Sequence, residues 1–95
     1  MTQFDARLAQ LRVRFQARAA EDRARLAVAL AARDLAQIRR LSHGLSGSGG
    51  VFGFASLSEA AEAVELAADE QRAWGEIEGL CHVLACAIDE AVQPL

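Results

Sequence analysis

His43 is the residue of this chain best placed to do chemistry, because it interrupts a glycine-rich segment that still keeps a helical pattern (residues 39–54). At about 100° per residue, His43 points about 160° away from the core direction set by Leu45, and therefore toward solvent. Gly47 and Gly50, four and seven residues later, share that outer face. A histidine on a face cleared of side chains is one that another protein's backbone could approach closely.

Two arginines flank this histidine on the preceding helical turn. Arg39 and Arg40 lie four and three residues before His43, so their guanidinium groups could stabilise an anionic group carried on the imidazole. The alternative is an ordinary surface histidine in a glycine-rich linker. Exposure, glycine spacing and flanking charge together favour a histidine that handles an anion.

The composition predicts that helices alone position this residue. Apolar residues make up 53% of the chain and many are alanine, the strongest helix former. The single proline, Pro94, comes too late to interrupt a helix, and tyrosine is absent. We therefore expect an all-α fold.

The first helix is expected to begin near Thr2, with an apolar face at Phe4, Leu8, Leu11 and Phe15. The pattern weakens at Glu21 and Asp22 and resumes at Leu26, so we expect a kinked helix or two helices, with the break or bend between Arg18 and Asp22. The N-terminal part of this face either joins the core or extends beyond it to contact a partner.

Three further helices follow. Asp34 with Gln37 predicts one start, Gly53 the stop, and Ser56 with Glu59 the next start as a capping box. A turn near residues 72–75 precedes the last helix, in which Gly79 could allow a close helix crossing. The inward stripes are Leu35, Ile38, Leu41, Leu45 and Phe52; then Leu57, Ala61, Val64 and Ala68; then Ile77, Cys81, Leu84, Ile88, Ala91 or Val92, and Leu95. Single stripes predict one domain, residues 1–95, folded as an antiparallel four-helix bundle.

Charge and motifs exclude several classes of function. A net charge of −3 is not that of a nucleic-acid binder, and no apolar run reaches membrane-spanning length. The chain has no phosphate loop and no Ser–His–Asp set. Cys81 and Cys86 are expected to be reduced and mostly buried, and with His82 they have the wrong spacing for zinc. We expect a cytoplasmic monomer with no signal peptide, metal or cofactor.

The segment around His43 resembles the histidine-containing phosphotransfer (HPt) domain family. The family pattern is His-x-Leu-Lys-Gly, a glycine three residues on, then a hydrophobic residue and a glycine. The corresponding residues here are His43, Leu45, Ser46, Gly47, Gly50, Phe52 and Gly53. The motif match covers about residues 34–66, and the helical pattern is compatible over the whole chain.

The resemblance implies that His43 accepts a phosphoryl group from the aspartate of a receiver domain and passes it to another receiver. Response-regulator receiver domains are the implied partners, with a hybrid sensor histidine kinase as a further one. The chain would be a phosphocarrier without an ATP site, and the Mg²⁺ would belong to the receiver. In some family members a carboxylate on the next helix orients the histidine. Glu65 occupies that place, and Glu62 lies one helical turn earlier.

One residue departs from the family pattern. The lysine three residues after the histidine, which helps neutralise the phosphoryl group, is Ser46 here. Arg39 or Arg40 could supply the charge instead. Ser46 also keeps open an alternative, a degenerate module that docks receivers or kinases without carrying phosphate. An unrelated structural bundle is a further alternative.

Overall fold

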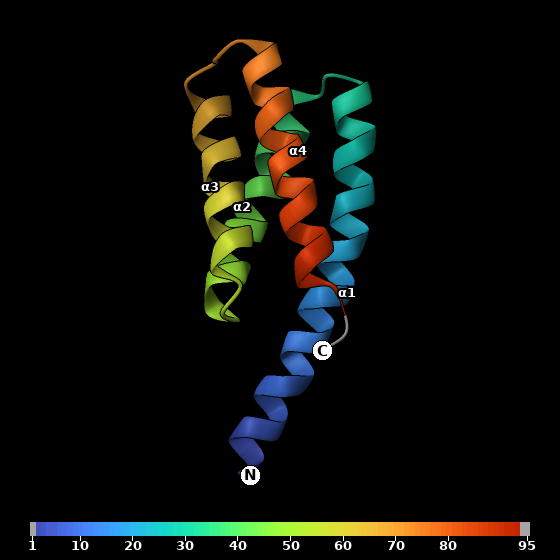
Figure 1. The fold of residues 1–95 in the computed structure, drawn as a ribbon, viewed down its shortest axis with the longest axis vertical. Helices are drawn as coiled ribbons and strands as arrows, with labels where there is room; N and C mark the ends of the chain where they lie inside the picture. The colour runs from blue at the N-terminus through green and yellow to red at the C-terminus, as the bar shows by residue number, and fades with distance from the viewer. Residues whose placement is uncertain (1, 94–95) are drawn as a thin grey trace.

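The computed structural model describes residues 2–93, which form four α-helices joined by short connections (Figure 1). The helices are α1 (Gln3–Ala31), α2 (Leu35–Val51), α3 (Ala55–Asp69) and α4 (Trp74–Ala91). Each runs antiparallel to the next, and α1 also packs on α4, which closes the bundle. The expected all-α, antiparallel four-helix bundle is confirmed. The expected position of Leu95 on the last stripe lies outside the described residues, as do Met1 and Pro94.

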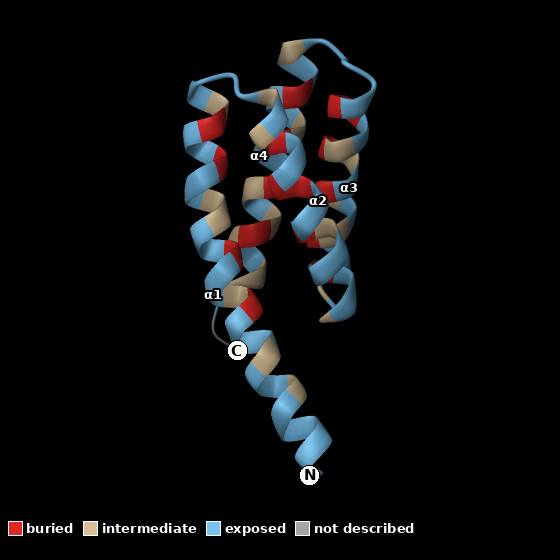
Figure 2. Cartoon of the chain, turned by 180° about the vertical axis from the view of Figure 1, so that it is seen from behind, coloured by how far each residue is buried: buried red, intermediate tan, exposed pale blue. Residues whose placement is uncertain are grey.

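The core forms where the four apolar stripes meet (Figure 2). The inward residues expected on α3 are all buried, and those on α4 are buried up to Ile88 while Ala91 and Val92 are half-buried. On the stripe of α2, only Leu35 and Phe52 remain partly exposed. The largest side chains with almost no exposed surface come from all four helices: Leu26, Ile38, Leu57, Val64, Ile77, Leu84 and Ile88. Burying a leucine or isoleucine side chain is worth about 1.5–3 kcal/mol, so this shared core holds the helices in fixed rotation.

The first helix is one continuous element, which is one of the two expected alternatives, and the chain does not break into two helices between residues 18 and 22. Ala19 and Leu26 are both buried on one face, and Asp22 occupies the stripe position between them. The carboxylate of Asp22 accepts a hydrogen bond from Arg25 at 2.9 Å. One acid therefore interrupts the apolar pattern without interrupting the helix, because its charge is paired one turn away.

The N-terminal turns of α1 project beyond the bundle (Figure 1). Phe4 is 74% exposed and Leu8 and Leu11 are half-buried, while Phe15 is the first residue of the stripe to enter the core. Phe4 is therefore not a core residue. The helix start is as expected: the Asp5 N–H donates to Thr2 Oγ1 at 3.1 Å, in a capping box.

The connection between α2 and α3 is set by Gly53, whose φ of 83° places it in the left-handed region. The Phe54 N–H then donates to the Gly49 carbonyl at 2.8 Å, which closes the end of α2. This turn brings α3 to its start at once, with Phe54 as N-cap. The expected capping box at Ser56 is therefore wrong, since Ser56 already lies inside α3. The expected start at Asp34 is confirmed by its bond from the Gln37 N–H, 3.1 Å long.

A glycine does allow a close helix approach, but at Gly49 rather than Gly79. A Cβ on Gly49 would lie 2.9 Å from Leu57 Cδ2, closer than packed atoms come, whereas one on Gly79 would meet nothing within 4 Å. Gly79 is exposed, so the crossing expected there is wrong. The close contact at Gly49 draws α2 and α3 together and sets the distance between the side chains that face each other across them.

Replacing Ser42 should stabilise the protein. Ser42 is fully buried in α2, and its hydroxyl finds no hydrogen-bond partner among residues 2–93. A buried orphan hydroxyl costs about 1–3 kcal/mol, so Ser42→Ala should raise the free energy of unfolding in urea by about 1–2 kcal/mol. The control is Ser48→Ala on the exposed side of α2, which gains only helix propensity. Equal stabilities of the two variants would show that the Ser42 hydroxyl costs nothing.

Candidate functional site

His43 lies on the outer face of α2, with 72% of its side chain exposed. Its neighbours Ser42 and Leu45 are buried, which fixes the rotation of the helix and turns the imidazole outward. A Cβ on Gly44 or Gly47 would meet no atom of the described part of the chain within 4 Å, so the surface beside the ring is open. The exposure inferred from the helical pattern is confirmed, and a partner can reach the ring without displacing any side chain at these two positions.

The imidazole is held by a carboxylate of the neighbouring helix. His43 Nδ1 lies 2.5 Å from Glu65 Oε2 on α3. An ionised carboxylate can only accept a hydrogen bond, so Nδ1 carries the proton and the lone pair of the neutral ring lies on Nε2. The Glu65 side chain is only 18% exposed, which restricts its movement. Glu62 is exposed on the same helix and makes no contact of this kind with His43 within residues 2–93.

Arg39 links this pair to a fourth side chain. Its Nε donates to Asp69 at 2.5 Å, and its Nη2 lies 3.9 Å from Glu65 Oε2. The hydrogen bond from Arg39 to Asp69, followed by the charge of that acid, raises the pKa of the guanidinium above its ordinary value. Asp69 was missed by sequence reasoning. The sequence signal that could have identified Asp69 is its position four residues after Glu65, one turn further along the same helix face.

The other predicted supporting residues lie around this cluster in different directions. Arg40 donates to Gln37 and lines the groove between α1 and α2, away from α3. Ser46 is half-buried, and its backbone carbonyl accepts a hydrogen bond from the Ser58 hydroxyl at 2.8 Å. Gly50 is exposed, and a Cβ there would lie 3.5 Å from the same hydroxyl. The structure thus brings Glu65 and Arg39 together with His43, and turns Arg40 aside.

The two cysteines differ, which corrects the expectation that both are mostly buried. Cys81 is fully buried, and desolvation raises the pKa of its thiol to about 11. Cys86 is exposed on the outside of α4. His82 is exposed as well. Within residues 2–93, no three side chains of histidine, cysteine, aspartate or glutamate gather as metal ligands.

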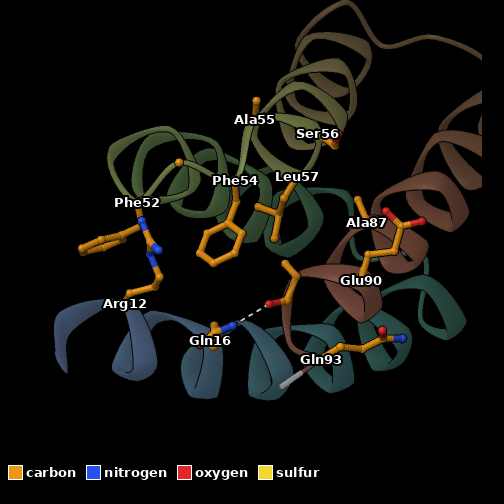
Figure 3. A pocket seen from close by; sticks show the side chains of 12 residues that line it. Arg12, Gln16, Phe52, Phe54, Ala55, Ser56, Leu57, Ala87, Glu90 and Gln93 are labelled. Atoms are coloured by element: carbon orange, nitrogen blue, oxygen red, sulfur yellow. Dashed lines mark hydrogen bonds between the residues drawn. The ribbon is translucent and has the colours of Figure 1, made fainter. Parts of the chain in front are cut away.

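A hollow of about 450 Å³ lies at the end of the bundle where α1 leaves it (Figure 3). The ring of Phe54 stacks on Phe15 with centroids 5.4 Å apart, and Arg12 lies 5.9 Å from the centre of the Phe54 ring. Gln16 donates to the Ala91 carbonyl at 2.7 Å across the hollow. Neither these contacts nor the lining of the hollow include His43, Glu65, Arg39 or Asp69. The hollow therefore lies apart from the candidate site.

Comparison with known proteins gives one match. A family model described as the Hpt domain matches residues 10–93, which include all four helices apart from the projecting start of α1. No curated protein and no solved structure matches the chain. Among the residues the structure describes, no helix has the length and apolar character required to cross a membrane.

Proposed function

Because the chain belongs to the Hpt domain family, whose domains serve phosphotransfer in two-component relays, we propose that His43 is its phosphoacceptor. It would take a phosphoryl group from the aspartate of one receiver domain and pass it to another receiver. The observation that carries this proposal is the bond between His43 Nδ1 and Glu65, on an outward face beside Gly44 and Gly47. That arrangement leaves Nε2 as the free nucleophilic atom.

The reaction is an in-line displacement at phosphorus. The Nε2 lone pair of His43 forms the N–P bond while the P–O bond to the receiver's aspartate breaks, and the aspartate leaves as a carboxylate. Such a transfer depends mostly on positioning and on charge stabilisation, with little covalent help from the protein. The chain therefore needs to hold the imidazole in one orientation, and Glu65 does this through Nδ1.

Glu65 has a second effect once the phosphoryl group has arrived. With Nδ1 still protonated and Nε2 bonded to phosphorus, the ring of His43 carries a positive charge. The carboxylate of Glu65 at 2.5 Å stabilises that charge. Arg39, held beside Glu65 by Asp69, is the cation nearest to this cluster that the contacts identify, and we propose that it replaces the charge of the family lysine.

Ser46 supports a second candidate function, a docking module that binds receivers or kinases without carrying phosphate. The chain contains ten arginines and no lysine, so no lysine from elsewhere replaces the missing one. A transfer assay separates the two functions. A receiver domain from the same genome, phosphorylated with acetyl phosphate, is mixed with the chain. We expect acid-labile phosphate on the chain, and a docking module would bind the receiver but gain none.

We propose that the chain acts as a single monomeric domain in the cytoplasm, with receiver domains and a hybrid sensor histidine kinase as partners. The transfer step requires no metal, nucleotide or nucleic acid bound to the chain, because the receiver supplies both the phosphoryl group and its Mg²⁺.

Substitutions of Gly47 should affect the stability of the helix and the rate of phosphoryl transfer separately. A methyl group on Gly47 would meet no atom, so Gly47→Ala should stabilise α2 by about 1 kcal/mol. Gly47→Leu should fold equally well yet slow transfer about tenfold or more, because the larger side chain stands where the receiver must approach His43. Thermal unfolding and rapid-quench kinetics measure the two effects. Unchanged transfer by the leucine variant would mean that the open surface is not used.

A further inference from the structure

The groove between α1 and α2 carries the opposite sign of charge to the whole chain. It has a volume of about 680 Å³, and its walls are Arg14, Arg18 and Arg25 on α1 and Arg40, Gly44 and Ser48 on α2. The chain has a net charge of −3, yet this groove holds four arginines against two acids. We name it the α1–α2 groove.

Most of this positive charge is not neutralised within the protein. Arg25 pairs with Asp22 at 2.9 Å and with Glu21 at 3.6 Å, which accounts for both acids. Arg40 donates only to the uncharged amide of Gln37. Arg14 and Arg18 are exposed and form no ion pair within residues 2–93. Three guanidinium groups thus line one groove without an ion pair among residues 2–93, and an anionic partner would complement this positive surface.

The α1–α2 groove is continuous with the proposed phosphoacceptor face. Gly44 lines the groove and directly follows His43 in the sequence. Because Gly44 and Gly47 have no side chains, neither of them separates the groove from His43. The opposite side of His43 carries Glu65 and Asp69 on α3 with the Arg39 guanidinium bound between them, so this trio has one net negative charge. A partner seated over His43 therefore meets positive charge on its α1 side and negative charge on its α3 side.

We propose that the α1–α2 groove, through Arg14, Arg18 and Arg40, docks an acidic surface of the receiver domain that exchanges phosphate with His43. This inference rests on the proposed function. Carboxylates on the receiver other than those that hold its Mg²⁺ would pair with the guanidinium groups of the groove. The asymmetry of charge across His43 fixes the rotation of the receiver about the line of transfer, and selects receivers whose acidic groups lie on the matching side.

The test compares Arg14→Gln/Arg18→Gln with Arg7→Gln/Arg72→Gln, which removes the same charge outside the groove. Binding of a receiver from the same genome, activated with beryllofluoride, is measured by titration calorimetry, and transfer is measured with the acetyl-phosphate-charged receiver. We expect the groove variant to bind about tenfold more weakly and to lose kcat/KM by a similar factor at low salt. The difference should shrink in about 0.5 M NaCl, because salt screens exposed charges.

The outcomes separate this inference from the proposed function. If the wild-type chain accepts phosphate and the two double variants behave alike, the groove proposal is wrong and the phosphoacceptor proposal stands. If binding depends on the groove arginines while no phosphate reaches His43, the groove proposal stands alone. Absence of salt-dependent binding to every receiver tested contradicts the groove proposal. So does self-association of the wild-type chain that the groove variant loses, because a second copy would then be the occupant.

Discussion

His43→Gln should abolish phosphorylation of the chain while leaving its fold intact. Glutamine has no nucleophilic ring nitrogen, and the 72% exposure of the native side chain means that little packing is lost. We expect acid-labile label from a phosphorylated receiver to fall by at least about a thousandfold, to background, since the covalent intermediate cannot form. Circular dichroism and urea unfolding should match the wild-type protein within about 0.5 kcal/mol.

The control for this variant is the second histidine of the chain. His82 is also exposed but lies on α4, away from the Glu65 carboxylate that holds His43. His82→Gln should keep full labelling. Label that survives in His43→Gln and disappears in His82→Gln would move the acceptor to α4 and refute the assignment.

Glu65→Gln should slow transfer about 10- to 100-fold without preventing it. The amide keeps the size of the side chain but loses the charge that stabilises the phosphorylated ring, and it can donate to Nδ1 and so favour the wrong tautomer. The distance of 2.5 Å between Nδ1 and Oε2 makes this the contact most sensitive to the change. Rapid-quench transfer from a labelled receiver measures the rate.

Glu62→Gln is the matched control, because it removes the same charge from the exposed surface of the same helix. We expect the rate of the Glu62 variant to stay within about twofold of wild type, since exposed charges at this distance are screened. A rate for Glu65→Gln equal to that of Glu62→Gln would show that the bond to His43 has no part in the reaction. The binding of the receiver itself should be unchanged in the Glu62 variant.

The fold was predictable because each helix carries one apolar stripe of regular period. The stripe of α3, and that of α4 up to Ile88, are buried as expected, and the outward direction of His43 followed from the burial of Leu45 alone. The sequence left open whether α1 is one helix or two, because a pattern of apolar residues cannot show that Asp22 is paired with Arg25 one turn later. The period of apolar residues identifies the buried face of a helix, and an acidic residue on that face resembles the end of the helix.

Features that depend on how helices meet were beyond the sequence. The bond from Arg39 to Asp69 requires the rotation of α3 against α2, which no spacing within one helix contains. Gly49 and Gly79 look alike in sequence, and only the crossing of α2 and α3 separates them. Likewise, α1 has 29 residues whereas α2 has 17. The first turns of α1 therefore extend past the helices on which α1 packs. Phe4 is exposed for that reason.

Nitrogen-15 NMR of the imidazole during transfer tests the central claim directly. The chain is labelled at histidine and mixed with a receiver that is phosphorylated by acetyl phosphate. We expect the Nε2 resonance of His43 to acquire coupling to phosphorus while Nδ1 keeps its proton, held by Glu65 at 2.5 Å. A phosphorylated Nδ1, a phosphorylated His82, or ring resonances that stay unchanged in the presence of the charged receiver would contradict the proposed role of His43.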